Sequence, residues 1–550
     1  MTNKDLANLI FPDLKHDTEY YEKLYPERDL KEGQYVTRFA PSPTGYMHIG
    51  NFMSALIDYI IYKNSDGVFF LRNEDTDKAR EIPDAVEKIT HVLNHYGLKP
   101  TEYEYDGKIV GNYGPYIQSE RIDIYHAYIK KAIEMGRAYP CFCNKEELDT
   151  MRVNQERKKQ RTGYYGKYAR CRFLSIDEMC NKIKNNEDYV IRFKSMGDFE
   201  TKIPFDDEVK GRIEFPSNDE DFVIMKSSDK LPTYHFAHLV DDHLMHTTHV
   251  VRGEEWISSV PKHIELFEAF GFKLPKYIQY PLILKQDGDI KRKISKRKDP
   301  EASMSFYEEN GYAPYAVVEA VMTIINSNYE EWRRSNPDAL FTDFKFSADK
   351  MSASGALFDL EKLNNISKDI ISKMKASDLC DKSYEWACIY DTDFKELIDR
   401  DKNYYTSILN IEREQEKPRK DIYNYKMIKS LIWYMYDNLF DKEDKVYEWK
   451  NITDKDEIKN ILNTYMTKYY DENDEKDVWF SKIKEMCELL GYASNIKEYK
   501  KNPENFKGNV ADVSTVLRVA LTTKSNTPDL YHIMKLLGKD RMKERYSKFN

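Results

Sequence analysis

Residues 35–72 change from strand-like to helical sequence and back to strand-like sequence. Residues 35–40 read YVTRFA, a short apolar run that ends at the breaker-rich PSPTG of residues 41–45. Apolar residues then recur at helical spacing from His48 onward, and residues 66–72 read DGVFFLR, the next strand. Two strands joined by a helical crossover lie parallel in one sheet, so this segment predicts a parallel α/β fold.

The composition limits the classes to which the chain belongs. At 550 residues it exceeds the length at which one hydrophobic core stops growing, so several domains are expected. Hydrophobic residues make up 41% of the sequence, no apolar run is long enough to span a membrane, and the N-terminus lacks a secretory pattern. We therefore expect a cytoplasmic protein. With a net charge of −9, any contact with nucleic acid must use a local basic face.

The turn at residues 41–45 is a candidate phosphate loop. The dinucleotide fingerprint GxGxxG and the Walker pattern GxxxxGK[ST] are both absent from the sequence. A turn that leads into a helix nevertheless offers free backbone N–H groups and a positive helix end. His48 can donate to an oxyanion there, and Gly50 leaves room for a flat base. Taken alone, this HxG pattern is more typical of an ordinary capped helix.

A second basic element lies far along the chain. Residues 291–298 read KRKISKRK, with six basic residues in eight. Such a run usually forms a solvated face or a nucleic-acid patch when it stands alone. Paired with the turn at residues 41–45, it favours a site in which two loops hold one triphosphate.

These two segments resemble the paired HIGH and KMSKS signatures of class I aminoacyl-tRNA synthetases, because residues 48–51 read HIGN and residues 293–297 read KISKR. Further segments resemble bacterial-type glutamyl-tRNA synthetases, in that family's order: RFAPSPTGYMHIGN, LRNEDTDKAR, GPYIQSERIDIYHAYI, PTYHFAHLVDDHL, HVVRGEEW, SVPKH, GALFDLEKLN, LRVALTTKSNTPDLY and LLGKDRMKERY. The resemblance implies an ATP-dependent ligase that activates glutamate as its adenylate and then esterifies it to tRNA.

The resemblance also implies an α/β architecture. A Rossmann-like, parallel-sheet catalytic domain carries an α+β insertion and is followed by a mainly α-helical anticodon-binding half. The expected segments are an N-terminal extension (1–34), the first catalytic half (35–138), an inserted acceptor-binding domain (139–230), the second catalytic half (231–290), the KISKR loop and stem-contact region (291–370) and the helical anticodon-binding domain (371–550). Amphipathic patterns at residues 425–440 and 479–490 also predict helices.

The family's functional residues match positions in this sequence. The resemblance assigns catalysis to His48, Lys293 and Lys296. The implied ATP contacts, assisted by Mg²⁺, are His48, Gly50, Asn51, Glu255, Trp256, Lys293, Ser295 and Lys296. The implied glutamate contacts are Arg38, Ser42, Glu74, Tyr234, His238 and Arg252. The planar guanidinium groups of Arg38 and Arg252 suit a carboxylate. For Tyr234 and Trp256, a purely structural role in the hydrophobic core stays open.

Three cysteines stand where some relatives carry a structural zinc knuckle with three cysteines and a tyrosine or histidine: Cys141, Cys143 and Cys171. The fourth ligand stays open, because Lys167 occupies the position of the relatives' tyrosine. The candidates for the fourth ligand are Tyr165, Tyr168 and Cys180. Reduced structural cysteines are the alternative, since seven cysteines are too few for a disulfide framework in a chain of this length.

The implied partners are ATP, L-glutamate and tRNA(Glu), with tRNA(Gln) left open as a further substrate, and we expect a monomer. Glutaminyl-tRNA synthetase has the same fold, but HIGN, VDDHL and a helical C-terminal half favour the glutamate enzyme. The truncated paralogue that glutamylates a tRNA base lacks the long segment that follows residue 297 here. A tRNA-binding scaffold without catalysis is disfavoured by the intact His48, Lys293, Lys296, Arg38 and Arg252.

Overall fold

The computed structural model describes residues 1–442 and 444–549, which divide into two compact units. Unit 1 comprises residues 1–306 and 318–360, and unit 2 comprises residues 307–317 and 361–550. Among the described residues, no helix is long and apolar enough to cross a membrane. The predicted limit at residue 370 lies inside helix α13 (Leu360–Lys373), close to the start of the main part of unit 2. The finer subdivision of unit 1 stays a prediction.

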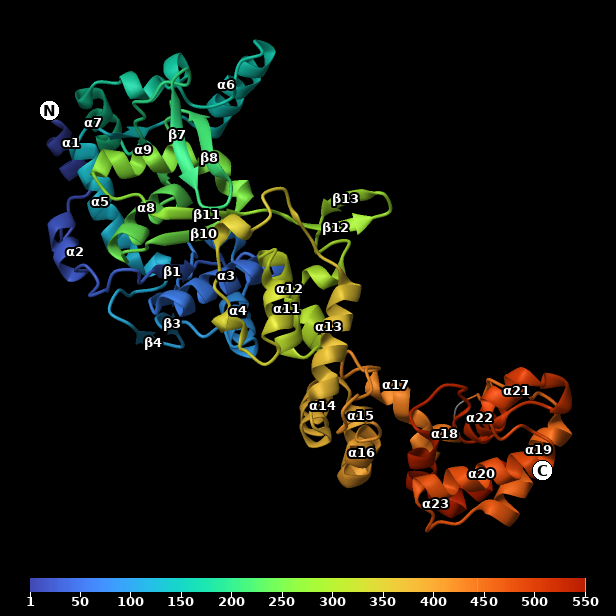
Figure 1. The fold of residues 1–550 in the computed structure, drawn as a ribbon. Coiled ribbons are helices and arrows are strands. Elements are labelled where there is room, and N and C mark those ends of the chain that lie inside the picture. Colours follow the sequence, from blue (N-terminus) through green and yellow to red (C-terminus); the bar gives the residue numbers. More distant parts are fainter. Residues whose placement is uncertain (443, 550) are drawn as a thin grey trace. The chain divides into compact units, whose positions relative to one another are not determined.

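The core of unit 1 is a parallel sheet. Strand β1 (Val36–Phe39) pairs in parallel with β2 (Val68–Leu71), and β10 (His249–Gly253) pairs in parallel with β11 (Lys276–Tyr280). Strands β1 and β10 lie side by side, because the Thr248 N–H donates to the Val36 carbonyl at 3.0 Å (Figure 1). The two parallel pairs, β1-β2 and β10-β11, thus lie next to each other although about 200 residues separate them in the sequence. This arrangement confirms the predicted Rossmann-like parallel sheet.

Helix α3 (Ile49–Ser65) is the predicted crossover between β1 and β2. Its apolar residues recur every three or four positions, and Phe52, Leu56 and Ile60 have no exposed surface. The helix packs against both β1 and β10. Its N-terminus therefore points to the edge of the sheet where these strands end, which is the usual place for a ligand in an open parallel sheet.

Residues between the two halves of this sheet form a separate antiparallel layer. Strands β5 (Ala138–Cys141), β6 (Val190–Phe193) and β9 (Val223–Met225) form one sheet, in the order β5-β6-β9. Strands β7 (Lys202–Asp207) and β8 (Gly211–Pro216) form a hairpin. The YVIRFK segment at residues 189–194 contains β6, and the RIEFP segment at residues 212–216 lies in β8. The helices of this region are α6 (Lys145–Arg157) and α7 (Ile176–Lys184).

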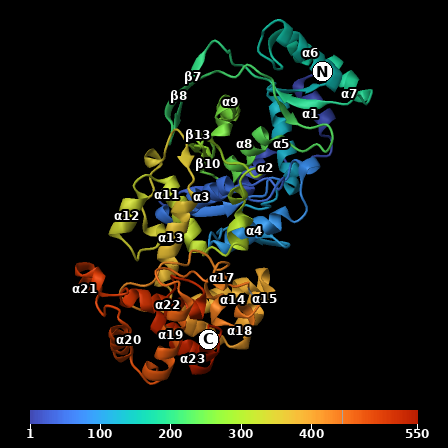
Figure 2. The same ribbon diagram turned by 90° about the vertical axis from the view of Figure 1, so that its right-hand side faces the viewer.

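The first residues of the chain pack onto unit 1 as two helices, α1 (Asn3–Ile10) and α2 (Thr18–Leu24). Helix α1 lies beside α5 (Ile122–Glu134) and α7 in both views of the ribbon (Figures 1 and 2). Its Leu6 side chain is 2% exposed, whereas Leu24 at the end of α2 is 47% exposed. The N-terminal segment therefore contributes to the hydrophobic core of unit 1.

The remaining elements complete both units. Those of residues 1–360 are α4 (Ala85–His95), α8 (Tyr234–Leu244), α9 (Val260–Phe270), α10 (Met304–Glu309), α11 (Pro314–Ile325), α12 (Tyr329–Ser335), β3 (Tyr103–Tyr105), β4 (Lys108–Val110), β12 (Ile283–Asp287), β13 (Ile290–Lys293) and β14 (Ala356–Leu357). The later helices are α14 (Ala376–Tyr390), α15 (Thr392–Arg400), α16 (Lys402–Leu409), α17 (Ile428–Ile432), α18 (Asp437–Phe440), α19 (Lys455–Thr464), α20 (Lys476–Leu490), α21 (Ile496–Lys501), α22 (Val510–Thr522) and α23 (Leu530–Ser547).

Unit 2 is helical, as predicted, but the pattern at residues 425–440 does not form one long helix. It divides into α17, a 3₁₀ turn at residues 433–435 and α18, with Tyr436 in an extended conformation between them. Tyr425, Tyr434 and Phe440 are all buried. These large aromatic side chains are buried along the whole segment, whereas one straight helix would bury only one face. Tertiary packing therefore overrides the helical preference of the sequence here. The pattern at residues 479–490 does form α20.

We predict that Leu6→Ala destabilises unit 1, because it opens a cavity between α1 and its neighbours. The expected loss is about 2–5 kcal/mol of the free energy of unfolding. Calorimetric unfolding of the full chain measures it as a lower transition temperature. Leu24→Ala is the matched control, since this exposed side chain should contribute no more than about 0.5 kcal/mol. Equal effects of the two substitutions would show that α1 does not belong to the core.

Candidate active site

A cavity of about 710 Å³ opens at the edge of the parallel sheet where β1 and β10 end. Its wall combines the turn after β1, the start of α3, the residues after β2, the start of α8 and the loop after β13. The wall includes most of the predicted site residues: Arg38, Ser42, His48, Asn51, Glu74, Tyr234, Arg252, Glu255, Trp256 and Lys296. Segments more than 200 residues apart therefore meet at one place.

His48 is the N-cap of α3, and this role determines its hydrogen-bonding state. Its Nδ1 accepts the backbone N–H groups of Gly50 at 3.0 Å and Asn51 at 3.2 Å. A ring nitrogen that accepts two N–H groups carries no proton, so the proton of the neutral ring is on Nε2. Burial lowers the pKa of His48 to about 4, and the charges of Lys296 and Lys293 act in the same direction. At neutral pH the ring therefore presents one N–H donor.

The two signature loops meet at this helix start. Lys296 donates a hydrogen bond from Nζ to the carbonyl of Tyr46, two residues before His48. Lys293 is exposed and does not line the cavity, although its charge reaches His48. Ser295 also lies off the wall. The structure thus brings Lys296 and His48 to one cavity, whereas Lys293 ends strand β13 and Ser295 lies in the loop after it, both off the cavity wall.

A carboxylate that the sequence analysis did not identify holds this loop. Asp299 is 1% exposed and accepts hydrogen bonds from both terminal nitrogens of Arg292, at 2.6 and 2.7 Å. It also accepts the Ser295 N–H at 2.9 Å. Because these bonds close the turn from both sides, they fix the backbone from which Lys296 extends. In the sequence, the only sign of this contact was that Arg292 and Asp299 lie on either side of the KISKR motif.

The two arginines assigned to glutamate have different environments. Arg38 donates from Nε to Asp242 at 3.1 Å, so a carboxylate compensates its charge. Arg252 is 6% exposed, and its Nη1 contacts only the Tyr234 hydroxyl at 3.4 Å and His263 Nδ1 at 3.2 Å. Its Nε and Nη2 are buried without a hydrogen-bond partner among the described residues. Buried guanidinium donors without a partner, on a residue that lines a cavity, have the chemistry to bind a carboxylate.

Asp242 itself lies in a buried ionic network that the sequence analysis missed. Arg72 donates to Asp242 at 3.0 Å and to Glu74 at 2.8 Å. Although burial acts to raise the pKa of Asp242, the charges of Arg38 and Arg72 hold it well below its ordinary value. Asp242 is therefore ionised. The VDDHL sequence contained the signal, since two adjacent acidic residues in an apolar helix require buried partners.

Three further predicted residues occupy informative positions. Tyr234 lies against Trp256, with ring centroids 4.3 Å apart, so the two aromatics form one side of the cavity. His238 is fully buried and does not line the cavity, because its ring bonds to Asp242 and to the Tyr277 hydroxyl. Gly50 also lies off the wall, and a Cβ there would meet the His48 ring at 2.8 Å. The glycine therefore makes room for the His48 ring, and its contact with a flat base stays a prediction.

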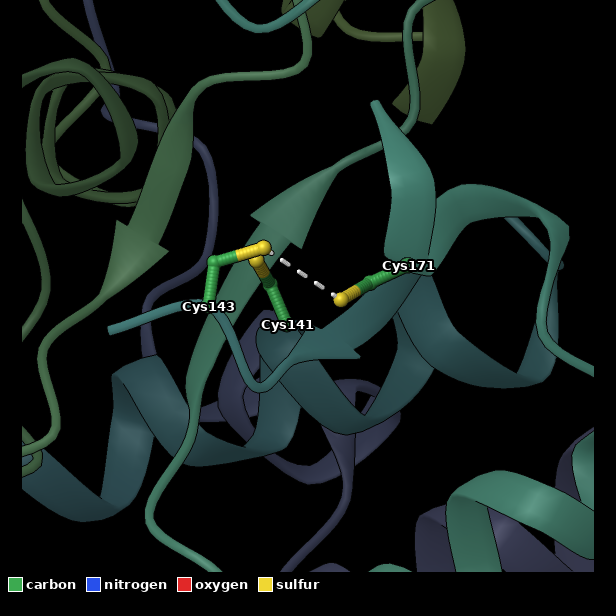
Figure 3. Close-up of side chains that lie close together, drawn as sticks. All are labelled: Cys141, Cys143 and Cys171. Carbon is green, nitrogen blue, oxygen red and sulfur yellow. Dashed lines mark hydrogen bonds between the residues drawn. The ribbon is translucent and has the colours of Figure 1, made fainter. Parts of the chain in front are cut away.

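The three cysteines of the predicted zinc site lie together, with sulfur atoms within 4.8 Å of one another (Figure 3). The sulfurs of Cys143 and Cys171 are 3.6 Å apart. The residue that joins them is Tyr164, whose hydroxyl lies 3.4 Å from the sulfurs of both Cys141 and Cys143. None of the three candidates for the fourth position joins this group. The hydroxyls of Tyr165 and Tyr168 bond elsewhere, and Cys180 lies on α7.

These distances fit a tetrahedral zinc ion. With Zn–S bonds near 2.3 Å and a Zn–O bond near 2.0 Å, the edges of a tetrahedron are about 3.8 Å between sulfurs and about 3.5 Å between sulfur and oxygen. The observed separations of 3.6 Å and 3.4 Å are close to these values. Tyr164 was missed because sequence spacing placed the tyrosine later in the chain.

Comparison with known proteins agrees with this geometry. Residues 34–365 match the family model for the catalytic domain of class I tRNA synthetases (E and Q), and residues 421–549 match an anticodon binding domain. The chain is 46% identical to a glutamate–tRNA ligase of Clostridium perfringens over the full length of both chains, and 39% identical to one of Sorangium cellulosum, covering 96% of this chain and 97% of that one.

Among solved structures, a glutamate tRNA ligase from Elizabethkingia meningosepticum in complex with its amino acid superposes with a TM-score of 0.75. It is 26% identical to this chain, and the match covers 94% of this chain and 99% of that one. The two family models cover the parallel strands, the cavity and residues 421–549 of the helical unit, and the Clostridium perfringens ligase matches the whole chain. The chain therefore belongs to the glutamate–tRNA ligase family of class I tRNA synthetases.

Proposed function

We propose that this chain is an ATP-dependent glutamate–tRNA ligase. It activates L-glutamate as glutamyl-adenylate with release of pyrophosphate, and then transfers the glutamate to the 3′-terminal adenosine of tRNA(Glu). The observation that carries the proposal is the cavity, where His48 and Lys296 meet beside the unpaired donors of Arg252. A triphosphate and an acidic amino acid are the substrates that these groups suit.

Activation is an in-line attack of the glutamate α-carboxylate on the α-phosphorus of ATP. The reaction needs position and charge neutralisation rather than a protein nucleophile. His48 donates its Nε2–H to a phosphate oxygen, and the turn before it contributes backbone donors. Lys296 and Lys293 neutralise the charge that moves onto the leaving pyrophosphate. When bound together with the triphosphate, Mg²⁺ would supply further neutralisation of the phosphate charge.

Selection of glutamate rests on Arg252. Its free Nε and Nη2 donors bind the γ-carboxylate of the substrate as a planar fork. A glutamine side chain would turn its NH₂ group toward these donors and leave buried N–H groups unpaired. Glu74 and Tyr234 line the same cavity and receive the α-amino group. Arg38 lines the part of the cavity that binds glutamate, and its hydrogen bond to Asp242 holds the Arg38 side chain in place.

The helical unit binds the tRNA partner. The match of residues 421–549 to an anticodon binding domain supports tRNA as the second substrate. We further infer that the enzyme is a cytoplasmic monomer. A charging assay with purified tRNA(Glu) and tRNA(Gln) decides whether both tRNAs are substrates.

The cysteine cluster holds a structural zinc ion in this proposal, with Cys141, Cys143, Cys171 and Tyr164 as its ligands. The ion would link strand β5 to the segment that carries Cys171 and so stiffen the inserted region. Zinc bound by four protein ligands has no open position, so the site takes no part in the reaction.

Pyrophosphate exchange tests the proposed function and the role of Arg252 together. The unmodified chain should catalyse exchange that depends on glutamate, measured with and without tRNA because this family commonly needs tRNA for activation. Arg252→Ala should raise the KM for glutamate by roughly a hundredfold, since it removes the partner of a buried charge, and leave the KM for ATP unchanged. Equal losses for both substrates would contradict the assigned role. No exchange under either condition would favour a catalytically silent scaffold.

Lys296→Ala should slow adenylate formation by about a hundredfold, because it removes a cation that stabilises the transition state. Rapid-quench measurement of adenylate formation gives this rate. The affinity for tRNA should change little. Lys298→Ala in the same loop is the matched control, since Lys298 is exposed and does not line the cavity. A selective loss of tRNA binding by Lys296→Ala would instead identify the loop as a nucleic-acid patch.

The purified chain should contain about one zinc ion, as four protein ligands close a structural site. Emission spectroscopy should find this metal in the unmodified chain and in Cys388→Ser, whose exposed thiol lies in unit 2. Cys143→Ser should lose it, and Tyr164→Phe should release it faster to a chelator. Equal metal content in all four proteins would exclude this cluster as the site.

A further inference from the structure

Among the described residues, the Nη1 group of Arg252 is bound by neutral groups. Its Nη1 contacts Tyr234 and His263, and the face of the guanidinium lies 4.5 Å from the centre of the Tyr277 ring. His263 lies on α9 and has no exposed surface. It cannot contact a substrate in the cavity, because it does not line the wall.

The donor and the acceptor in each hydrogen bond of His263 can be assigned from its neighbours. An arginine only donates, so His263 Nδ1 must accept from Arg252 at 3.2 Å and carries no proton. The proton of the ring is then on Nε2, which donates to Nδ1 of His235 at 3.0 Å. His235 in turn carries its own proton on Nε2. His235 therefore supports this tautomer of His263, because its Nδ1 accepts the proton on His263 Nε2.

Both histidines are neutral at neutral pH. Burial lowers the pKa of His263 well below its ordinary value, and the neighbouring His238 and Arg252 act in the same direction while Asp242 opposes them. Burial also lowers the pKa of His235 to about 3, with a contribution from Lys262. The pair therefore orients the guanidinium without adding a negative charge beside it.

Arg38 shows the alternative within the same cavity. Its acceptor is the ionised Asp242, so its charge is already paired. A carboxylate in the place of His263 would pair Arg252 in the same way and reduce its attraction for a second carboxylate. A neutral acceptor leaves the full charge of Arg252 available to the substrate.

We propose that His263 is a specificity-determining positioning residue for the amino-acid side chain, and that His235 sets its tautomer. This pair of neutral histidines holds Arg252, a residue of the cavity wall, whose buried Nε and Nη2 have no hydrogen-bond partner among the described residues, and leaves its charge uncompensated. This inference rests on the proposed glutamate-ligase function and deepens it, because it identifies which buried groups make the site select an acidic side chain.

Three substitutions at one position test the proposal. His263→Asn places an amide oxygen where Nδ1 accepts from Arg252, whereas His263→Gln has the same amide one carbon further out, near the position of Nε2. His263→Leu has no acceptor. The KM for glutamate, the KM for ATP and the preference for glutamate over glutamine are measured by pyrophosphate exchange with the full chain and tRNA.

We expect His263→Gln and His263→Leu to raise the KM for glutamate by about tenfold or more, the effect of losing one hydrogen bond to a charged group. Their preference for glutamate over glutamine should fall, and the KM for ATP should not change. His263→Asn should stay within about threefold of the unmodified chain. His235→Leu should reproduce part of the effect, and should add nothing to His263→Leu when the two are combined, since both act through the same bond.

His249→Leu is the matched control. His249 is a buried histidine on β10, the strand that carries Arg252, but it bonds to Thr248 and does not line the cavity. This variant should retain the KM for glutamate. Thermal unfolding of every variant separates a lost fold from a lost orientation, and the comparison of Asn with Gln retains its meaning if Leu fails to fold.

Two results would overturn the inference. One is an equal KM for glutamate in His263→Asn and His263→Gln, and the other is a parallel rise in the KM for ATP. Glutamate-dependent exchange by the unmodified chain together with either result would reject the role of His263 alone. Absence of that exchange in the unmodified chain would instead reject the proposed function.

Discussion

The buried ion network beneath the cavity is the interaction on which the catalytic unit depends. Asp241 and Asp242 lie side by side on α8, where Asp242 binds Arg38 at 3.1 Å and Arg72 at 3.0 Å, while Asp241 binds Arg121 at 2.7 Å. These bonds join the first half of the parallel sheet to a helix about 200 residues later in the sequence. Removal of one partner from such a network typically costs about 3–5 kcal/mol, because the other charge stays buried. The network therefore fixes where the strands of the two halves end, and so where the cavity forms.

The electrostatics of the cavity follow from which charges this network pairs. Carboxylates compensate Arg38 and Arg72. Within the described part of the chain, Arg252 has two donors without a partner, and Lys296 donates from Nζ to a backbone carbonyl. The chain as a whole carries a net charge of −9, yet its cavity attracts anions. Local pairing rather than total charge decides what a site binds. His48 stays neutral chiefly because it is buried, and the charges of the nearby lysines also disfavour a further positive charge.

Local patterns in the sequence were enough to predict the strand, turn and helix that position His48, because periodicity and turn residues act over short distances. Contacts that depend on the tertiary fold could not be predicted from the sequence in the same way. Tyr164 rather than a later tyrosine approaches the cysteines, since a loop of turns folds it back. Gly50 makes room for the His48 ring, and His238 supports the cavity from behind. In the segment around Tyr436, aromatic burial outweighs helical periodicity. Each difference arises where packing between distant residues decides the outcome.

The loop that carries Lys296 illustrates how folding prepares the site for its substrate. A flexible lysine on a free loop would lose conformational entropy each time it met a phosphate. Here Asp299 closes the turn by bonding Arg292 and the Ser295 N–H, so the backbone beneath Lys296 is ordered before any substrate arrives. Most of the ordering cost then falls on folding rather than on binding. In the proposed reaction, attack on the α-phosphorus depends on position and charge more than on a protein nucleophile, so a cation held in advance beside the triphosphate would contribute directly to the rate.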